Sequence, residues 1–117
     1  MTESTHNTLL GIRQEALVHL SDSEKLIAEY SRYAETLEEM VDKLSLNLSD
    51  ETMDSYEKLK IEFENIQKKI VSESAWFDEL YVLMNSLKDS GDMDEERAQE
   101  IISKYQELRD KKVQQAV

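Results

Sequence analysis

The sequence contains no cysteine, no proline and only two glycines, Gly11 and Gly91. Without cysteine, the chain can form no disulfide bond, no thiolate metal site and no cysteine nucleophile. Proline and glycine commonly end helices and form tight turns, so a chain this poor in them contains few structural elements. A β fold, which needs many turns, is therefore disfavoured.

Basic residues and long apolar runs are also scarce. Lysine and arginine number 14 against 26 aspartates and glutamates, which gives a net charge of −12. Binding to phosphates or to an anionic membrane surface requires a basic face, so we expect neither direct nucleic-acid binding nor a membrane partner. No apolar run reaches transmembrane length, and residues 1–10 lack the pattern of a secretory signal. We predict a cytoplasmic protein, with the nucleus as an alternative.

What the sequence does contain is a seven-residue repeat of apolar residues in two stretches, 20–48 and 56–87. Only two of the repeated positions are polar, Ser23 and Glu73. This spacing is typical of long helices that pack side by side. A chain that is 39% apolar and 34% charged fits helices with a narrow buried seam better than a globule with a thick core.

We therefore predict an all-α fold, an elongated antiparallel three-helix bundle or coiled coil. Its two long helices cover about residues 8–46 and 50–88, and a shorter third helix covers about residues 92–114. We expect residues 1–117 to form a single helical domain in which residues 1–7 are disordered.

Local signals set these boundaries. Ser49 is a favourable N-cap for the second helix. Ser90-Gly91 provides a stop signal, and Asp92 with Glu95 three residues later has the spacing of a capping box. A similar signal at Ser21 could start a new helix. Because the apolar repeat continues through it, we favour one continuous first helix over a break at this point.

The third helix is short enough to cover only half of the hairpin formed by the two long helices. In the three-helix half we expect broad apolar faces to be buried, including those of Leu10, Leu17, Val18, Leu26, Trp76, Tyr81, Val82 and Leu83. In the two-helix half, residues 34–66, part of the apolar surface should stay exposed, and such surface tends to mark an interface. The candidate apolar partner-binding residues are Tyr33, Leu37, Met40, Val41, Leu44, Met53 and Ile61. Scattered exposure without a function is the alternative.

Acidic side chains also gather in the two-helix half. The candidate acidic partner-binding residues are Glu35, Glu38, Glu39, Asp42, Asp50, Glu51, Asp54 and Glu57. Such runs usually form a solvated face, and the alternative is a surface complementary to a basic partner.

The antiparallel register places Ser23 and Glu73 within about one helical turn of each other. We interpret them as one polar core layer. It could be a partly exposed layer at the edge of the third helix, a contact that fixes the register of the helices, or a functional site.

Patterns that support catalysis or metal binding are missing from the sequence. The two histidines, His6 and His19, match no metal-ligand or catalytic spacing. Residues 89–100 begin like a calcium-binding loop, but Gly91 and Met93 stand at ligand positions and Asp94 replaces the required glycine. We expect no enzymatic activity, no catalytic residue, no metal and no cofactor.

These features favour a non-catalytic protein–protein interaction protein. It would be a helical adaptor, a structural subunit or a chaperone-like factor that binds partner helices, and a homodimer is one form that such binding could take. The alternative is an acidic inhibitor that mimics nucleic-acid charge and blocks a basic groove of a partner enzyme. The expected partner is therefore a protein, either helical or basic.

Overall fold

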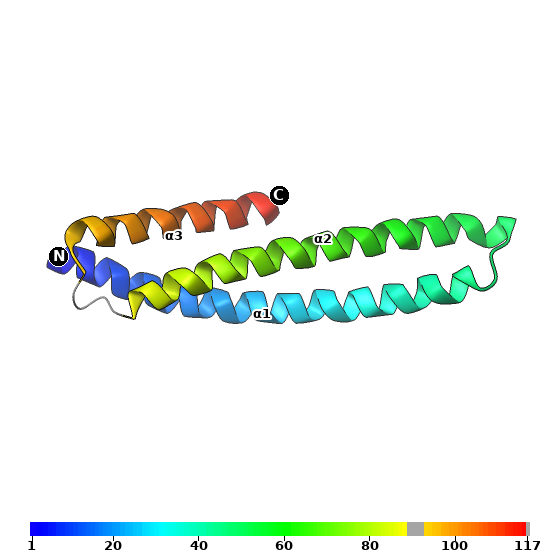
Figure 1. Cartoon of the computed structure of the whole chain (residues 1–117), viewed down its shortest axis with the longest axis horizontal. Helices are drawn as coiled ribbons and strands as arrows, with labels where there is room; N and C mark the ends of the chain where they lie inside the picture. Colours follow the sequence, from blue (N-terminus) through cyan, green and yellow to red (C-terminus); the bar gives the residue numbers. More distant parts are fainter. Residues whose placement is uncertain (89–92, 117) are drawn as a thin grey trace. The chain divides into compact units, whose positions relative to one another are not determined.

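Three helices make up nearly all of the described chain, which comprises residues 1–88 and 93–116 of the computed structural model. α1 spans Glu3–Ser45, α2 spans Asp50–Leu87 and α3 spans Glu95–Ala116 (Figure 1). Consecutive helices run antiparallel. No strand occurs in these described residues, and the predicted all-α class is confirmed.

The chain divides into two compact units. Unit 1 consists of residues 1–23 and 75–117, and unit 2 consists of residues 24–74. Both α1 and α2 contribute to each unit, and α1 continues through Ser21 without a break, as predicted. That the whole chain behaves as a single domain stays a prediction.

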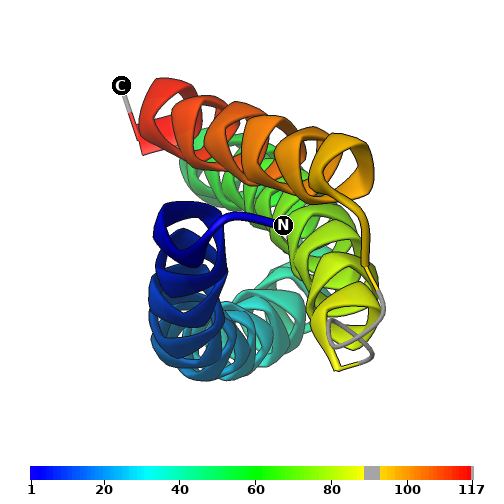
Figure 2. The same cartoon turned by 90° about the vertical axis from the view of Figure 1, so that its left-hand side faces the viewer.

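Unit 1 is a bundle of three helical segments: the first part of α1, the last part of α2 and all of α3 (Figure 2). All three contribute to its core, which consists of Leu9, Ile12, Ala16, Leu20, Trp76, Leu80, Leu83, Met84, Leu87, Ala98, Ile101, Tyr105 and Leu108. Polar contacts join the segments at the edge of this core. The indole Nε1 of Trp76 donates a hydrogen bond to the carbonyl oxygen of Leu108, and the Tyr105 hydroxyl donates one to the Glu15 carboxylate.

The apolar faces predicted to be buried in this part of the chain are less extensive than expected. Trp76 and Leu83 are buried, and Leu26, which belongs to unit 2, is half-buried. The other five predicted residues are exposed, namely Leu10, Leu17, Val18, Tyr81 and Val82. A third helix covers only one side of a helix pair, which leaves Leu10, Leu17 and Tyr81 in solvent on the opposite side. Val82 lies instead along the open groove between α2 and α3.

The first turn of α1 is fixed to the start of α3. Thr2 is the N-cap, because its Oγ1 accepts a 3.1 Å hydrogen bond from the N–H of Thr5. The buried Thr5 hydroxyl donates a 2.6 Å hydrogen bond to Glu95, and the Thr2 N–H donates a 3.1 Å bond to the same carboxylate. These contacts account for a correction, since residues 3–7 are helical rather than disordered and α1 begins at Glu3 rather than near Thr8.

Asp94 caps the start of α3. Its Oδ1 accepts a 2.8 Å hydrogen bond from the N–H of Arg97. The sequence placed this cap at Asp92, which, like the predicted Ser90-Gly91 stop signal, lies outside the described residues. Glu95, the predicted capping partner of Asp92, accepts the hydrogen bonds from α1 instead.

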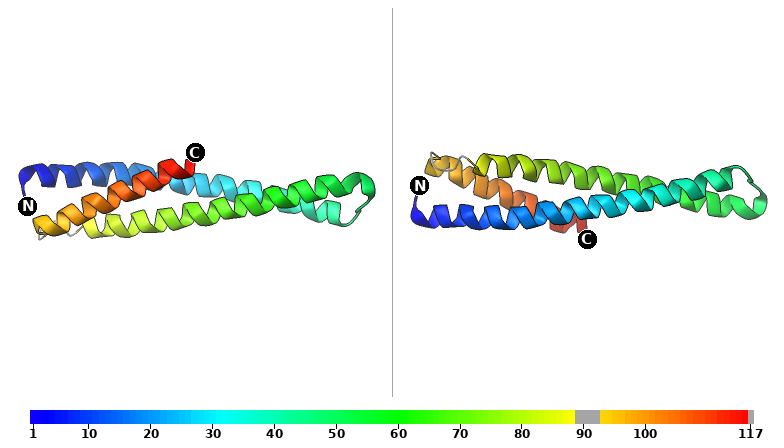
Figure 3. Two further views of the ribbon diagram at one scale, coloured as in Figure 1. Left: turned by 90° about the horizontal axis from the view of Figure 1, so that it is seen from above. Right: turned by 90° about the horizontal axis from the view of Figure 1, so that it is seen from below.

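Unit 2 contains only two helical segments, the second part of α1 and the first part of α2 (Figure 3). Its core is smaller, with Ala34, Leu37 and Ile66 buried and with Tyr30, Leu59, Phe63 and Ile70 partly buried against them. Residues 46–49 connect the two helices. Ser49 caps α2 as predicted, because its carbonyl oxygen accepts a 2.9 Å hydrogen bond from the N–H of Met53 and its own N–H donates to Thr52 Oγ1. A unit of two helices leaves a larger share of its apolar surface in solvent.

Candidate partner-binding surface

One side of the helix pair in unit 2 is marked by a contact between Tyr33 and Glu62. The Tyr33 hydroxyl donates a hydrogen bond to the Glu62 carboxylate, so these two residues meet across α1 and α2. Met40 follows Tyr33 by one heptad and Ser55 precedes Glu62 by one heptad, which places both on the same side. We call this side, with Tyr33 and Met40 from α1 and Ser55 and Glu62 from α2, the tyrosine flank.

The tyrosine flank presents apolar side chains to solvent. Tyr33 is 42% exposed and Met40 is 44% exposed. Leu37, which was predicted to bind a partner with them, is only 3% exposed and belongs to the core of unit 2. Because Leu37 is buried, it is not on the surface of the folded unit, and its predicted contact with a partner stays a prediction. Val41 and Leu44 are half-buried.

The other predicted apolar contacts do not share the tyrosine flank. Met53 and Ile61 are both exposed. At about 100° per residue, Met53 lies on the opposite side of α2 from Glu62, and Ile61 points away from α1 altogether. The predicted patch is therefore divided among three surfaces. Placing each residue on its heptad position could have revealed this from the sequence.

All eight predicted acidic contacts are exposed. Among them, within the described part of the chain, only Asp54 forms an ion pair, with Lys58 at 3.0 Å. The other carboxylates are available to solvent or to a partner.

Most of these carboxylates lie away from the tyrosine flank. Counted around α1 from the buried Leu37, Glu38 points to the side opposite Met40, and Glu35 and Asp42 lie near Glu38. The same count places Asp50 and Glu57 on the matching side of α2, beyond Met53. We call this side the acidic flank; it consists of Glu35, Glu38, Asp42, Asp50, Met53 and Glu57. Unit 2 therefore separates an apolar flank from an acidic one.

The two polar residues inside the apolar repeat are both buried. Ser23 is a residue of unit 1 and Glu73 is a residue of unit 2. Burial agrees with their repeat positions, and the predicted polar layer that would join them stays a prediction.

The titratable groups with shifted proton affinity in unit 1 belong to helix–helix contacts. Burial, together with the hydrogen bond to Glu15, raises the pKa of Tyr105 to about 12. The hydrogen bond from the Thr5 hydroxyl is the main cause that lowers the pKa of Glu95. Both shifts follow from the way α3 packs against α1.

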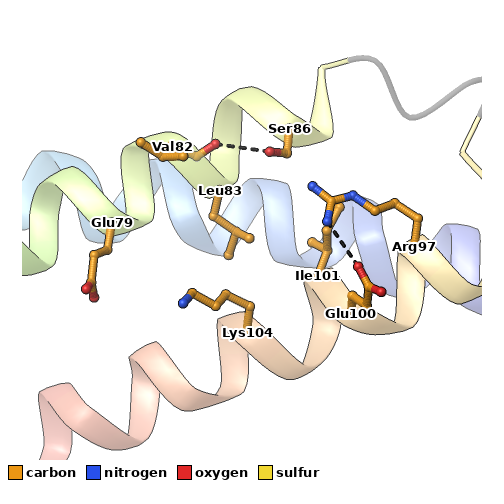
Figure 4. Close-up of a pocket in the computed structure, with 8 residues that line it drawn as sticks. All are labelled: Glu79, Val82, Leu83, Ser86, Arg97, Glu100, Ile101 and Lys104. Atoms are coloured by element: carbon orange, nitrogen blue, oxygen red, sulfur yellow. Dashed lines mark hydrogen bonds and ion pairs between the residues drawn. The ribbon is translucent and has the colours of Figure 1, made fainter.

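A groove of about 310 Å³ opens between α2 and α3 in unit 1 (Figure 4). Leu83 and Ile101 form its floor, and Glu79 and Lys104 face each other from the two helices. The hydroxyl of Ser86, one of the described residues that line the groove, donates a hydrogen bond to the carbonyl oxygen of Val82 on the same helix.

A second groove, of about 450 Å³, lies between α1 and α3. Gly11, Ile12 and Tyr105 contribute to its wall, and Glu15 and Arg109 lie 3.9 Å apart at its rim. Because Glu15 pairs with Arg109, the groove favours neither a cationic nor an anionic ligand.

In residues 1–88 and 93–116, no three His, Cys, Asp or Glu side chains gather in a way that could hold a metal ion. No helix in this part of the chain combines the length and the apolarity required to cross a bilayer.

Comparisons with known proteins give no match: no protein-family model, no curated protein and no solved structure matches the chain.

Proposed function

We propose that this chain is a non-catalytic protein–protein interaction protein that binds a partner helix along the tyrosine flank of unit 2. It would serve as a helical adaptor, a structural subunit or a chaperone-like factor. The observation that carries the proposal is a contrast between the units. In unit 1, α3 covers one side of the α1–α2 pair, whereas the Tyr33 and Met40 side chains of unit 2 are exposed.

The tyrosine flank is suited to a helical partner because its apolar groups are spaced by one heptad along α1. A helix laid beside α1 presents its own side chains at the same interval. The hydrogen bond to Glu62 holds the Tyr33 ring in place before binding, which lowers the entropy that a partner must overcome.

The free energy gained by burying Tyr33 and Met40 determines what else a partner must contact. Burying what remains exposed of Tyr33 and Met40 contributes on the order of 2 kcal/mol in total. That amount is too small for stable association by itself. The partner must therefore also engage charged groups, namely Glu62 of the flank and the neighbouring Lys58 and Lys69.

The experiment begins with the full chain as bait and mass spectrometry to identify a bound protein, followed by a binding titration with that protein purified. The substitution Met40→Glu should weaken binding at least about tenfold, equivalent to about 1.4 kcal/mol. The matched control is Ile61→Glu, which introduces the same charge at an exposed position on the outer face of α2. Equal binding by the two variants would contradict the proposal.

A second candidate function is that of an acidic inhibitor that occupies a basic groove of an enzyme. The exposure of all eight predicted carboxylates, with only Asp54 in an ion pair within the described residues, favours it. Such binding would weaken steeply with salt, because it depends on unscreened charge.

One variant separates the two candidates. Replacing Glu38, Glu39, Asp50 and Glu51 with glutamine removes charge without changing the tyrosine flank. The inhibitor function requires that this variant lose most of its affinity and most of its salt dependence. Unchanged affinity would exclude charge mimicry and leave binding along the tyrosine flank as the proposal.

A further inference from the structure

We propose that the start of α1 is a conformational switch, which the Glu95 carboxylate holds in the helical state and which protonation of that carboxylate releases. The switch consists of residues 1–8, and it is docked beside the start of α3 (Figure 1). In the released state these residues leave α3 and lose their helical structure, while the rest of unit 1 stays folded.

The switch has little intrinsic tendency to form a helix. Residues 4–8 are serine, threonine, histidine, asparagine and threonine. These residue types have low helix propensities, because their side chains compete for main-chain hydrogen bonds or lose rotamer freedom in a helix. A helix of so few residues is unstable in water by itself. The disorder predicted from the sequence is therefore the expected state of residues 1–7 once they are detached from α3.

The switch also contributes little apolar surface to the bundle. Leu9 is the first residue of α1 in the core of unit 1. Met1 is the only apolar residue ahead of Leu9 in the sequence, and it is 42% exposed. The contacts that dock the switch are polar, and the hydrogen bonds from Thr2 and from the buried Thr5 end at the same carboxylate, that of Glu95.

Glu95 also fixes the cap of α1, through a chain of two hydroxyl groups. The Thr2 hydroxyl, which caps α1 by accepting from the Thr5 N–H, donates a 2.8 Å hydrogen bond to the Thr5 hydroxyl. The Thr5 hydroxyl donates to Glu95 at 2.6 Å, and the Gln99 amide donates to the same carboxylate oxygen at 3.2 Å. Such a chain is cooperative, so the docking and the capping of α1 depend on one carboxylate.

Protonation of Glu95 removes the negative charge on which these bonds converge. The hydrogen bond from the Thr5 hydroxyl is the main cause that lowers the pKa of Glu95 from the ordinary value of 4.5, followed by the bond from Thr2. A carboxylate with a lowered pKa stabilises the docked state fully above pH 4.5 and loses this contribution as the pH falls through its own pKa. The switch is therefore docked at neutral pH and released in acid.

Other charged groups affect this titration less. The positive amino group of Met1 lowers the pKa of Glu95 further, as the smallest of its causes. The Asp94 carboxylate is engaged as the cap of α3. Among the described residues, the other titratable neighbours are exposed to solvent, namely Glu3 and His6 of the switch, Lys88 after α2, and Glu96 and Arg97 of α3.

The helix that follows gives the switch limited support. Gly11 lies three residues after it, and glycine in a helix interior costs about 1 kcal/mol relative to alanine. Leu9 and Ile12, on the two sides of Gly11, are buried in the core of unit 1. Unwinding can therefore proceed from residue 1 to residue 8 and stop at Leu9, where the apolar contacts begin.

The test is NMR spectroscopy of the full chain as the pH is lowered from about 7 to about 3, a range that includes the titration of glutamate. The ¹³Cα chemical shift of each residue reports whether it is helical. Residues 3–8 should lose their helical shifts at a higher pH than residues 98–108, which carry the core contacts of α3. Loss of helix in both segments at the same pH would overturn the proposal.

A substitution tests the switch without acid. Glu95→Gln removes the charge at neutral pH, where every other carboxylate stays ionised. Residues 3–8 should then shift from helix toward coil, and their amide protection against hydrogen exchange should fall at least about tenfold. Thr5→Val, which keeps the shape of the side chain without its hydroxyl, should have the same effect.

Glu96→Gln is the matched control, because it removes the same charge from the next residue, whose side chain is exposed. It should leave residues 3–8 helical. A helical segment in Glu95→Gln, or an equal loss of helix in Glu96→Gln, would also overturn the proposal. Met40→Glu should not change these shifts, because Met40 belongs to the tyrosine flank of unit 2. The switch and the proposed partner helix can therefore fail independently.

Discussion

Trp76 and Leu108 are joined by a buried 2.7 Å hydrogen bond from the indole Nε1 to the main-chain carbonyl oxygen. The bond satisfies the polar edge of an otherwise apolar side chain, and its acceptor belongs to α3. On the same ring, the Lys112 Nζ lies 4.6 Å from the centroid. The attachment of α3 to α2 therefore depends more on the Trp76 side chain than on any ion pair at the surface.

Trp76→Phe should destabilise the protein by about 2–4 kcal/mol, because it leaves the Leu108 carbonyl without a donor and leaves a cavity beside it. Urea unfolding followed by circular dichroism measures the loss. Lys112→Ala is the comparison, and it should cost less than about 1 kcal/mol, since the cation–π contact that it removes is partly exposed. Equal costs for the two substitutions would contradict this account.

The stability of the protein should fall between pH 10 and pH 12. The folded pKa of Tyr105 is about 12 against 10.0 for an unperturbed tyrosine, so folding favours the protonated phenol. Its contribution is complete below pH 10 and is lost as the pH rises through 12. Tyr105→Phe provides the control because it retains the titration of every lysine. The difference in unfolding free energy between the two proteins should shrink over this interval, and a constant difference would refute the prediction.

Leu37→Ala should lower the free energy of unfolding by about 2–4 kcal/mol, because Leu37 is buried between Ala34 and Ile66. Met40→Ala, three residues away, should cost less than about 1 kcal/mol, since Met40 is half exposed. Thermal or urea denaturation distinguishes the two. A larger effect at Met40 would show that the tyrosine flank stabilises unit 2 more than its buried core does.

Amide hydrogen exchange should be faster in unit 2 than in unit 1. Unit 2 has three buried apolar residues in its core cluster, and unit 1 has thirteen. Local opening is easier where fewer apolar contacts must be broken. Mass spectrometry of peptides from residues 24–74 against those from residues 95–110 gives the comparison. Slower exchange in residues 24–74 would mean that the buried cores do not govern opening.

Gly11→Ala should stabilise the protein by about 0.5–1 kcal/mol. Gly11 lies inside α1, where glycine costs conformational entropy, and a Cβ built at this position meets nothing within 4 Å. The midpoint of urea unfolding should rise while the helical signal stays the same. A lower midpoint would show that close packing requires the glycine after all.

The repeat and the local caps were sufficient to predict the helices. The seven-residue spacing predicts which stretches are helical because the period is a property of the helix itself, and Ser49 was identified because capping involves residues close in the chain. The start of α1 was missed for the opposite reason. Thr5 is held by Glu95, and no local pattern shows that two residues so distant in sequence will meet.

The candidate surfaces were harder to predict than the fold. The exposure of the acidic residues followed directly from their charge. The exposure of the apolar residues could not be predicted without knowing how many helices surround each position. A heptad count says on which side of its helix a residue lies, but not whether another helix covers that side. Leu37 was therefore assigned to a partner although it packs within unit 2, and Leu17 and Tyr81 were assigned to a core although they are exposed.

The attachment of Thr5 to Glu95 has a practical consequence for engineering this protein. A fusion partner placed ahead of Met1 would begin next to the first turn of α3 and would compete with the Thr2 contact. The connection at residues 46–49 offers a better site for an inserted tag or reporter, because Leu46 is 82% exposed there. The capping bonds of Ser49 are made to Thr52 and Met53, which follow it in α2, so an insertion at Leu46 would leave them in place.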